Sequence, residues 1–196
     1  MDDTEIKALL ASDLDRHFGQ LVRVYEARLY MFMVRQTGQE QEAEDIVQEA
    51  FMQAYFALAR YSPRQREEMA LRPWLYKIAL NIFYTRLRKH RLSSVALDLS
   101  EDGPHLTIEE DLTQQPEALL EKQETRRELG NLLNQLPEHH RTVINLYYFA
   151  GLGYQEIADL LNVPSGTVRS LAHRGLKRLR ALLEPAPGKE KSTHAS

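Results

Sequence analysis

Basic and hydroxyl side chains share one face of a candidate helix near the carboxyl end of the chain. They recur at i, i+4 spacing: Arg169, Ser170, His173, Arg174, Lys177 and Arg178. No acidic residue occurs between Ser165 and Leu183. An Arg side chain can bond guanine bidentately in the major groove, and a Ser can bond a base or a phosphate. This pattern predicts duplex DNA binding; the competing interpretation is a solvated basic helix that closes a bundle.

A second basic region lies in the middle of the chain and is interleaved with aromatic residues. Residues 61–92 contain 8 Lys+Arg and 2 Asp+Glu, and Tyr76, Phe83 and Tyr84 lie among them. Such a mixture can neutralise phosphates and stack on bases, which is how single-stranded nucleic acid is held. Core packing is the competing interpretation for the aromatic residues, and for Trp74 we prefer it.

Asp45, Gln48 and Glu49 form a polar face on a helix whose other face is apolar. Taken alone, this arrangement is typical of a solvated surface. The charges along the whole chain are strongly segregated, although the net charge is only −3. Residues 93–124 contain 9 Asp+Glu and 1 Lys+Arg, so an acidic stretch separates the two basic regions. This segregation suggests two polyanion-facing surfaces on different modules, and ordinary solvated helix faces explain the charges equally well.

The elements that must position these residues are all predicted to be helices. Apolar residues recur at three- and four-residue steps, and no stretch shows sustained period-two alternation. The first helix should stop at Thr37 and Gly38, and the second near Pro63, followed by an Arg- and Glu-rich loop. A third apolar stripe begins at Trp74 and runs to about Leu92.

The carboxyl-terminal part predicts shorter helices. Leucines from Leu119 to Leu136 mark one helix, and Pro137 ends it and begins the next, which Gly151 and Gly153 break. Helices at about 154–161 and 165–183, joined by a tight turn, form a helix-turn-helix pattern. In the second of these, one face is apolar with small residues where helices must approach closely: Val168, Ala172, Gly175 and Leu179.

Composition and motif content argue against several classes of protein. The chain has no Cys, its seven His are scattered, and it lacks a Gly-rich phosphate loop, so we expect no metal, no cofactor and no enzymatic activity. The acidic amino terminus is unlike a secretory signal, and the apolar stretches are far shorter than the ~20 residues that span a bilayer. A cytoplasmic location is expected.

Several motifs in order resemble the sigma-70 family of bacterial RNA polymerase sigma factors, specifically the extracytoplasmic-function (ECF) group. The motifs are A-E-D-I-V-Q-E-A-F at 43–51, R-P-W-L-Y-K-I-A-L-N at 72–81, L-P-E-H-H-R-T-V at 136–143, Y-Q-E-I-A at 154–158 and V-P-S-G-T-V-R-S at 163–170. The resemblance implies an all-α fold of two small helical domains, one a domain 2-like bundle and the other a domain 4-like helix-turn-helix. Composition predicts a flexible acidic linker at 93–116 and a disordered tail at 185–196. The resemblance then makes 1–92 domain 2-like and 117–184 domain 4-like.

The resemblance also implies a role for each surface. It assigns Asp45, Gln48 and Glu49 to the beta-prime clamp helices of core RNA polymerase. It assigns seven residues to melted minus-10 DNA: Lys77, Ile78, Asn81, Arg86, Arg88, Lys89 and Arg91. A further seven are assigned to the minus-35 element: Thr167, Arg169, Ser170, His173, Arg174, Lys177 and Arg178. The chain departs from the family at Leu171, where the motif usually has Arg, which leaves the minus-35 sequence open.

The resemblance implies a transcription initiation factor that directs core polymerase to promoters and promotes melting. Its expected partners are the beta-prime clamp helices, the beta flap, promoter DNA and an anti-sigma protein of the kind that holds many family members inactive. A stand-alone helix-turn-helix regulator is the main alternative, and an all-helical adaptor without nucleic-acid affinity is another. The 43–92 region discriminates, because a regulator does not need an acidic polymerase-facing helix followed by a basic aromatic one.

Overall fold

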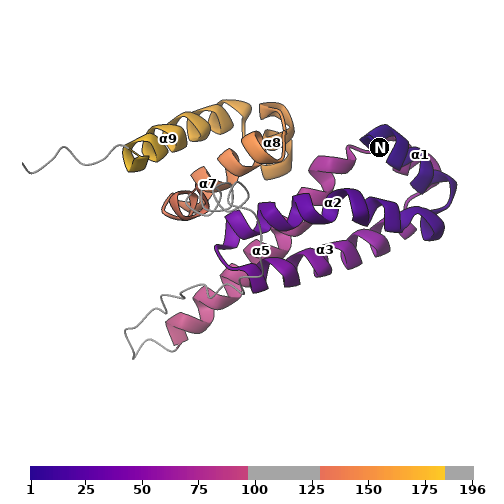
Figure 1. Cartoon of the computed structure of the whole chain (residues 1–196), viewed down its shortest axis with the longest axis horizontal. Helices are drawn as coiled ribbons and strands as arrows, with labels where there is room; N and C mark the ends of the chain where they lie inside the picture. Colours follow the sequence, from indigo (N-terminus) through magenta and orange to yellow (C-terminus); the bar gives the residue numbers. More distant parts are fainter. Residues whose placement is uncertain (97–128, 184–196) are drawn as a thin grey trace, which may run out of the picture.

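The computed structural model describes residues 1–96 and 129–183, and no strand occurs within these two ranges (Figure 1). The amino-terminal block consists of α1 (Asp3–Ser12), α2 (Leu14–Thr37), α3 (Glu40–Ala59), α4 (Pro63–Glu68) and α5 (Leu71–Ala96). The carboxyl-terminal block, residues 129–183, contains α7 (Glu138–Ile144), the π-helix η1 (Asn145–Phe149), α8 (Tyr154–Leu161) and α9 (Ser165–Leu183). The all-α fold class is confirmed.

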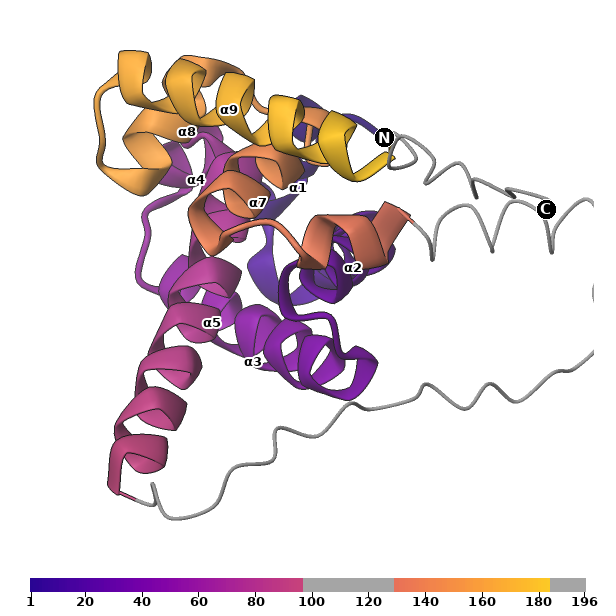
Figure 2. The ribbon, with the colours of Figure 1, turned by 90° about the vertical axis from the view of Figure 1, so that its left-hand side faces the viewer.

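The amino-terminal block is built on α2, α3 and α5. α3 packs against both α2 and α5, while α1 and α4 contact each other at one end of the bundle (Figures 1 and 2). Its interior consists of apolar side chains spaced by one helical turn, among them Leu21, Tyr25, Leu29, Phe32, Ile46, Ala50, Leu75 and Ala79. The apolar stripes read from the sequence therefore face one another.

The end of α2 matches the prediction. Gly38 follows Thr37 in the left-handed conformation, with φ of 78°, and its N–H donates to the carbonyl of Val34 at 2.9 Å. A Cβ at Gly38 would lie 2.9 Å from Nδ2 of Asn134 in the other block. Both the backbone conformation and the close approach therefore favour glycine here.

The predicted Arg- and Glu-rich loop after α3 is wrong in part, because it contains α4. Ser62 caps this helix by accepting a hydrogen bond from the N–H of Gln65 at 3.3 Å, and Gln65 Oε1 accepts from the N–H of Ser62 at 2.8 Å. Pro63 occupies the first turn, where its missing N–H costs nothing. The proline thus ends α3 and also begins the next helix.

α5 is longer than predicted and buries aromatic residues that we had considered for base stacking. It runs past Leu92 to Ala96, and its last turns project from the body of the molecule (Figure 2). Tyr76 and Phe83 are buried in the core, so the stacking interpretation is wrong for both. Trp74 is partly buried against the core, 6.2 Å from the ring of Tyr61, as its preferred interpretation requires.

The carboxyl-terminal block forms the predicted helix-turn-helix. α8 and α9 have the expected bounds, and Asn162 makes the turn between them with φ of 55°. Val168, Ala172 and Gly175 are buried on the inner face of α9. A Cβ at Gly175 would come within 2.7 Å of Cδ1 of Ile144, which explains a small residue at this position. The helix predicted after Pro137 is α7 continued by the π-helix η1.

Some predictions lie outside the described residues. These are most of the 93–116 linker, the helix residues Leu119 and Leu120, and the 185–196 tail. The helical stretch before α7 is described from residue 129 to residue 134. Leu133 and Leu136 in this region pack with Ile144 in a small separate cluster.

One hydrophobic cluster joins the two blocks. It contains buried residues of α1, α2, α3 and α5 together with others from the carboxyl-terminal block, including Val143, Leu146, Ile157, Val168 and Ala172. α8 packs against α5, and α7 and η1 pack against α2. The carboxyl-terminal block therefore lies directly on the amino-terminal block.

Candidate nucleic-acid interface

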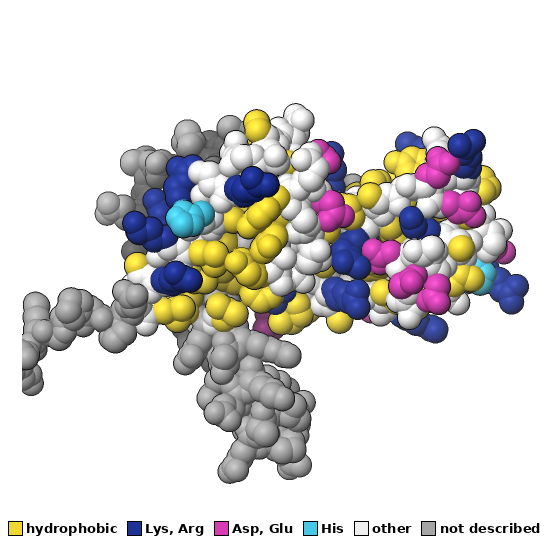
Figure 3. Space-filling model, turned by 90° about the horizontal axis from the view of Figure 1, so that it is seen from above, with side chains coloured by type: hydrophobic (Ala, Val, Ile, Leu, Met, Phe, Trp, Pro, Cys, Tyr) yellow, Lys and Arg dark blue, Asp and Glu magenta, His cyan; other side chains and the backbone are white. Residues whose placement is uncertain are grey.

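The basic face of α9 points outward. Six of its seven predicted DNA-binding residues are exposed: Thr167, Arg169, His173, Arg174, Lys177 and Arg178. Ser170 is half-buried. Seen from above, Lys, Arg and His side chains gather beside hydrophobic ones over the part of the molecule that contains α9 (Figure 3). A helix with its apolar side anchored and its basic side open has the form needed to enter a major groove.

Two arginines of this face have intramolecular partners. Arg174 bends along its own helix, donating from Nε to the Ser170 carbonyl at 3.3 Å and from Nη2 to the Ser170 hydroxyl. The guanidinium of Arg169 lies 5.9 Å from the centre of the Tyr154 ring in α8. Both arginines must exchange these contacts for DNA if they read bases.

The predicted minus-10 residues lie along α5. Lys77, Asn81, Arg88 and Lys89 are exposed, Ile78 and Arg86 are half-buried, and the side chain of Arg91 lies outside the described part of the chain. The buried residues Leu75, Ala79 and Ile82 hold the opposite side of α5 against the bundle. The helix therefore presents its polar side to the surface and to the carboxyl-terminal block.

A hollow of about 490 Å³ opens beside Asn81. Its walls are Asn81, Tyr84, Thr85, Leu87 and Arg88 of α5 and Glu138 of α7. It combines amide, hydroxyl, guanidinium and carboxylate groups with an apolar wall. These are group types that can receive an unstacked base.

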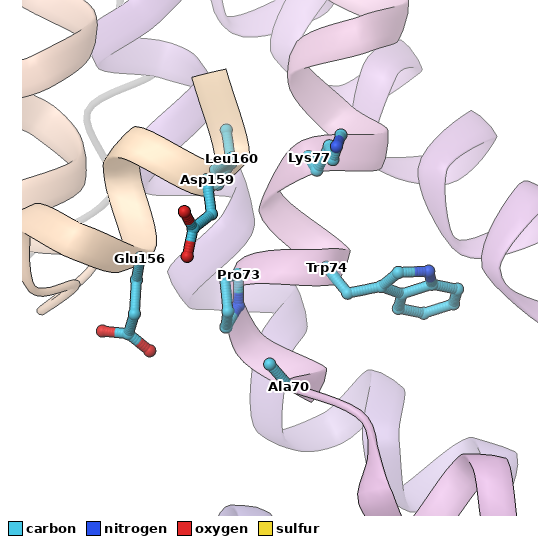
Figure 4. A pocket seen from close by; sticks show the side chains of 7 residues that line it. All are labelled: Ala70, Pro73, Trp74, Lys77, Glu156, Asp159 and Leu160. Atoms are coloured by element: carbon cyan, nitrogen blue, oxygen red, sulfur yellow. The ribbon is translucent and has the colours of Figure 1, made fainter. Parts of the chain in front are cut away.

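A second pocket, of about 250 Å³, lies between the first turns of α5 and α8. Ala70, Pro73, Trp74 and Lys77 line one side, and Glu156, Asp159 and Leu160 line the other (Figure 4). The carboxylates of Glu156 and Asp159 thus share a pocket with a predicted DNA-binding lysine. Both hollows along α5 contain acidic residues of the carboxyl-terminal block.

The acidic face of α3 is open, and Arg86 of α5, which we assigned to DNA, pairs with it. Asp45 and Gln48 are exposed and Glu49 is half-buried. Arg86 Nη2 forms an ion pair with Glu49 at 2.8 Å, and its Nη1 lies 3.9 Å from Asp45 Oδ2. The structure therefore brings Arg86 to the predicted polymerase-binding residues rather than to Asn81.

The start of α5 is fixed by a buried tyrosine and an ion pair. The Tyr25 hydroxyl donates to Asp3, whose Oδ2 lies 3.2 Å from Arg72 Nη2. Burial raises the pKa of Tyr25 to about 12, and the hydrogen bond to Asp3 acts in the same direction. This network ties α1, α2 and α5 together just before Trp74 and Lys77.

Sequence reasoning missed the polar residues that join the two blocks. Gln36, Thr142 and Asn145 are buried, and their side chains bond across the contact. The available signal was weak: Gln36 is a polar residue inside an apolar stripe, one turn after Phe32. Within residues 1–96 and 129–183, no group of His, Asp and Glu could hold a metal ion, and no helix there is long and apolar enough to cross a membrane.

Family models match two parts of the chain. Sigma-70 region 2 matches residues 21–93, and Sigma-70 region 4 matches residues 126–179. The ECF RNA polymerase sigma factor SigW of Bacillus subtilis is 35% identical over 183 residues, covering 91% of this chain and 94% of that protein. The RNA polymerase sigma-H factor of Pseudomonas aeruginosa is 34% identical, covering 87% and 88%.

Solved structures show the same fold. The sigma factor RpoE of Bartonella quintana, in complex with the anti-sigma factor NepR, aligns with a TM-score of 0.67 at 23% identity, over 85% of this chain and 96% of that one. CnrH, in complex with the cytosolic domain of CnrY, aligns with a TM-score of 0.62 at 27% identity, over 92% and 96%.

Proposed function

The chain belongs to the ECF group of the sigma-70 family and is a promoter-recognising transcription initiation factor. From this premise we propose that the polar face of α3 binds core RNA polymerase. Asp45, Gln48 and Glu49 contact the beta-prime clamp helices. The exposure of Asp45 and Gln48, and the face that they share with half-buried Glu49, support this role. Carboxylates suit a basic coiled coil, to which they add steering as well as affinity. The beta flap contacts the carboxyl-terminal block.

α5 supplies the minus-10 surface. Asn81 faces the hollow that receives a flipped base, and Ile78 lies nearby on the same helix. Lys77, Arg88, Lys89 and Arg91 contact phosphates. Unstacking a base costs a few kcal/mol, and contacts to the base and the backbone must offset it. We reassign Arg86 to the acidic face of α3, because it pairs with Glu49.

α9 reads the minus-35 element through Thr167, Arg169, Ser170, His173, Arg174, Lys177 and Arg178. The observation that supports the proposal most directly is the outward basic face of this helix, fixed by buried Val168, Ala172 and Gly175 on its inner face. Leu171 lies where the family usually has Arg, so one phosphate contact is weaker here.

The remaining roles follow from the same premise. The domains extend over 1–92 and 117–184, joined by the acidic segment 93–116, and the protein acts in the cytoplasm without performing covalent chemistry itself. An anti-sigma protein is a proposed partner because RpoE of Bartonella quintana is solved with one. The stand-alone regulator is not favoured, because both sigma-70 regions are present.

The proposal is tested by run-off transcription. Purified protein and core polymerase are combined with a library of genomic fragments, and the transcripts are mapped. We expect start sites that share two upstream elements about two helical turns apart. If no fragment gave a transcript while the protein alone bound duplex DNA tightly, the regulator would be the better explanation.

A further inference from the structure

The outer face of α3 changes character halfway along the helix. Residues 40–49 contain five Asp+Glu and no Lys or Arg, whereas residues 50–59 contain no charged residue. A helix whose outer face meets only water is normally polar along the whole of that face. The proposed polymerase-binding residues all lie in the acidic half, so they leave the other half of the same face without a role.

Two large apolar side chains lie on this uncharged half. Met52 is 62% exposed and Phe56 is 60% exposed, the two highest values among the large hydrophobic side chains that the structure describes. Because they are four residues apart, they are neighbours on the helix surface. Steps of three and four residues along α3 form one stripe about 16 Å long, which contains Asp45, Gln48, Met52 and Phe56. The apolar pair therefore continues the proposed polymerase-binding surface.

The Phe56 ring is held in place by its neighbours. Its centre lies 5.8 Å from that of the Tyr55 ring in an edge-to-face arrangement, and Tyr55 makes a similar contact with Phe18 of α2 at 5.1 Å. The Tyr55 hydroxyl also donates to the Asp15 carboxylate at 2.7 Å. An aromatic side chain that is fixed before binding loses less conformational entropy in a complex. Phe56 thus has the properties of a preorganised anchor.

The stripe lies on the outer side of the amino-terminal block. α3 packs against α2 and α5 and runs along the edge of this block that is remote from the carboxyl-terminal block (Figures 1 and 2). Exposed apolar side chains that adjoin one another, beside polar residues, mark interaction surfaces. The segregation along α3 indicates a partner surface that is basic opposite residues 40–49 and apolar opposite Met52 and Phe56.

We propose that Met52 and Phe56 anchor core RNA polymerase on α3 and set the lifetime of the complex, whereas the carboxylates of residues 40–49 set the rate at which it forms. The inference rests on the proposed role of α3. Large side chains that become fully desolvated in an interface carry most of the binding energy, and their loss mainly raises the dissociation rate. Exposed carboxylates act at longer range and mainly raise the association rate. The two halves of the stripe are therefore separable by kinetics.

The test measures both rates for the full chain on immobilised core polymerase by surface plasmon resonance. Phe56→Gln should dissociate roughly thirtyfold faster than the unaltered chain and Met52→Gln roughly tenfold faster, while both associate within about twofold of its rate. Phe56→Leu keeps an apolar side chain and should recover most of the lost lifetime. Asp45→Asn should instead lower the association rate a few-fold at low salt, and this effect should disappear at high salt.

Met31→Gln is the matched control for Met52→Gln. Met31 is 36% exposed and belongs to α2, so it lies outside the stripe, and the same substitution there should leave the dissociation rate unchanged. Circular dichroism and urea unfolding check that every variant keeps its helices and its stability, as expected for exposed positions.

The outcomes separate this inference from the proposed function. If the unaltered chain bound core polymerase and Met52→Gln/Phe56→Gln dissociated at the same rate, the inference would be overturned while the proposed function stood. If the unaltered chain did not bind core polymerase, both would fail. Sedimentation velocity tests a second copy of the chain as the occupant: self-association that the double variant abolished, with unchanged dissociation from polymerase, would assign the apolar pair to a dimer and overturn the inference.

Discussion

At the residue scale, Arg174 and Lys89 are both exposed and basic, yet we expect different consequences when each is removed. Arg174→Ala should relax preference at one minus-35 position, because a bidentate base contact gives about 1–3 kcal/mol of discrimination. Lys89→Ala should weaken binding to all promoters similarly and reduce the salt slope by about 1, as expected for one phosphate contact. Binding of the polymerase complex to a panel of minus-35 variants, with salt titrations, separates these outcomes. Equal effects of both changes on every promoter would contradict the assigned roles.

Arg86 and Arg88 provide a second comparison. Arg86 neutralises Glu49 across 2.8 Å, whereas Arg88 is exposed beside the hollow at Asn81. Arg86→Ala should raise the association rate with core polymerase a few-fold at low salt, because the carboxylates of α3 then steer a basic partner more strongly. Its DNA affinity should stay close to that of the unaltered chain, while Arg88→Ala should lower DNA affinity alone. Stopped-flow association and oligonucleotide binding measure the two effects. If Arg86→Ala weakened DNA binding as much as Arg88→Ala, the original assignment of Arg86 to phosphates would be restored.

At the scale of elements, the packing of α9 on α7 depends on Gly175. An alanine Cβ there would lie 2.7 Å from Ile144 Cδ1 and 3.2 Å from His140 Cβ, both in a buried contact. Overpacking of this kind costs about 1–3 kcal/mol, which should exceed the gain of about 1 kcal/mol from replacing a helical glycine. We therefore expect Gly175→Ala to be destabilised in urea unfolding.

Gly166 is the matched control for this substitution. It lies in the same helix, and a Cβ there would have nothing within 4 Å. Gly166→Ala should leave the free energy of unfolding unchanged or raise it by up to about 1 kcal/mol. Stabilisation by both substitutions would show that α9 can shift away from α7 at little cost.

The same helix pair should respond to pH through His140. Burial lowers the pKa of His140 below its ordinary value, and the nearby positive charges of His139, Arg178 and Arg174 act in the same direction. The unfolded chain therefore binds a proton more readily than the folded chain below about pH 6.5. Stability should be fully present above that pH and decline as the pH falls, with a slope of at most about 1.4 kcal/mol per pH unit for this proton.

Urea unfolding between pH 7.5 and 5.0 checks this expectation. His140→Leu removes the titrating group while keeping an apolar side chain against Ile144 and Gly175, so its stability should fall less over the same range. His139→Gln, at the exposed neighbouring position, is the control and should keep most of the original dependence. Identical slopes for the unaltered chain and His140→Leu would contradict the role of His140.

At the scale of the whole molecule, the sequence predicted the helices better than the way they come together. Helical periodicity, Gly38 and Asn162 account for the end of α2 and for the bounds of α8 and α9, because these signals are local. α4 was missed because Pro63 suggests the end of a helix as strongly as the first turn of one. The stacking interpretation of Tyr76 and Phe83 was wrong. The same aromatic ring can pack in a core or stack on a base, so the residue type alone does not distinguish the two roles.

The candidate surfaces were predicted residue by residue, but their relationship was not. The exposed face of α9 follows from the i, i+4 spacing of its basic residues. The pair between Arg86 and Glu49 joins residues 37 positions apart, and that between Gln36 and Thr142 joins residues 106 apart. No periodicity in one helix encodes such contacts, since they depend on how two helices are oriented. Both pairs therefore emerged only from the three-dimensional structure.

The distribution of charge over the whole molecule leads to a final prediction about free and polymerase-bound protein. The net charge is −3, the outward face of α9 is basic, and carboxylates of α7 and α8 line the hollows along α5. Free protein should therefore bind a promoter duplex only weakly, in the range of about 10⁻⁴–10⁻⁶ M typical of non-specific binding at physiological salt. With core polymerase the two basic surfaces act together, and affinity should rise at least roughly 10³-fold, into the specific range.

Fluorescence anisotropy of one labelled promoter fragment, with and without core polymerase, measures both values. A scrambled fragment is the control. Nanomolar, sequence-specific binding by the free chain would contradict this view, because it would mean that α9 alone provides the specificity that we attribute to two surfaces held in register.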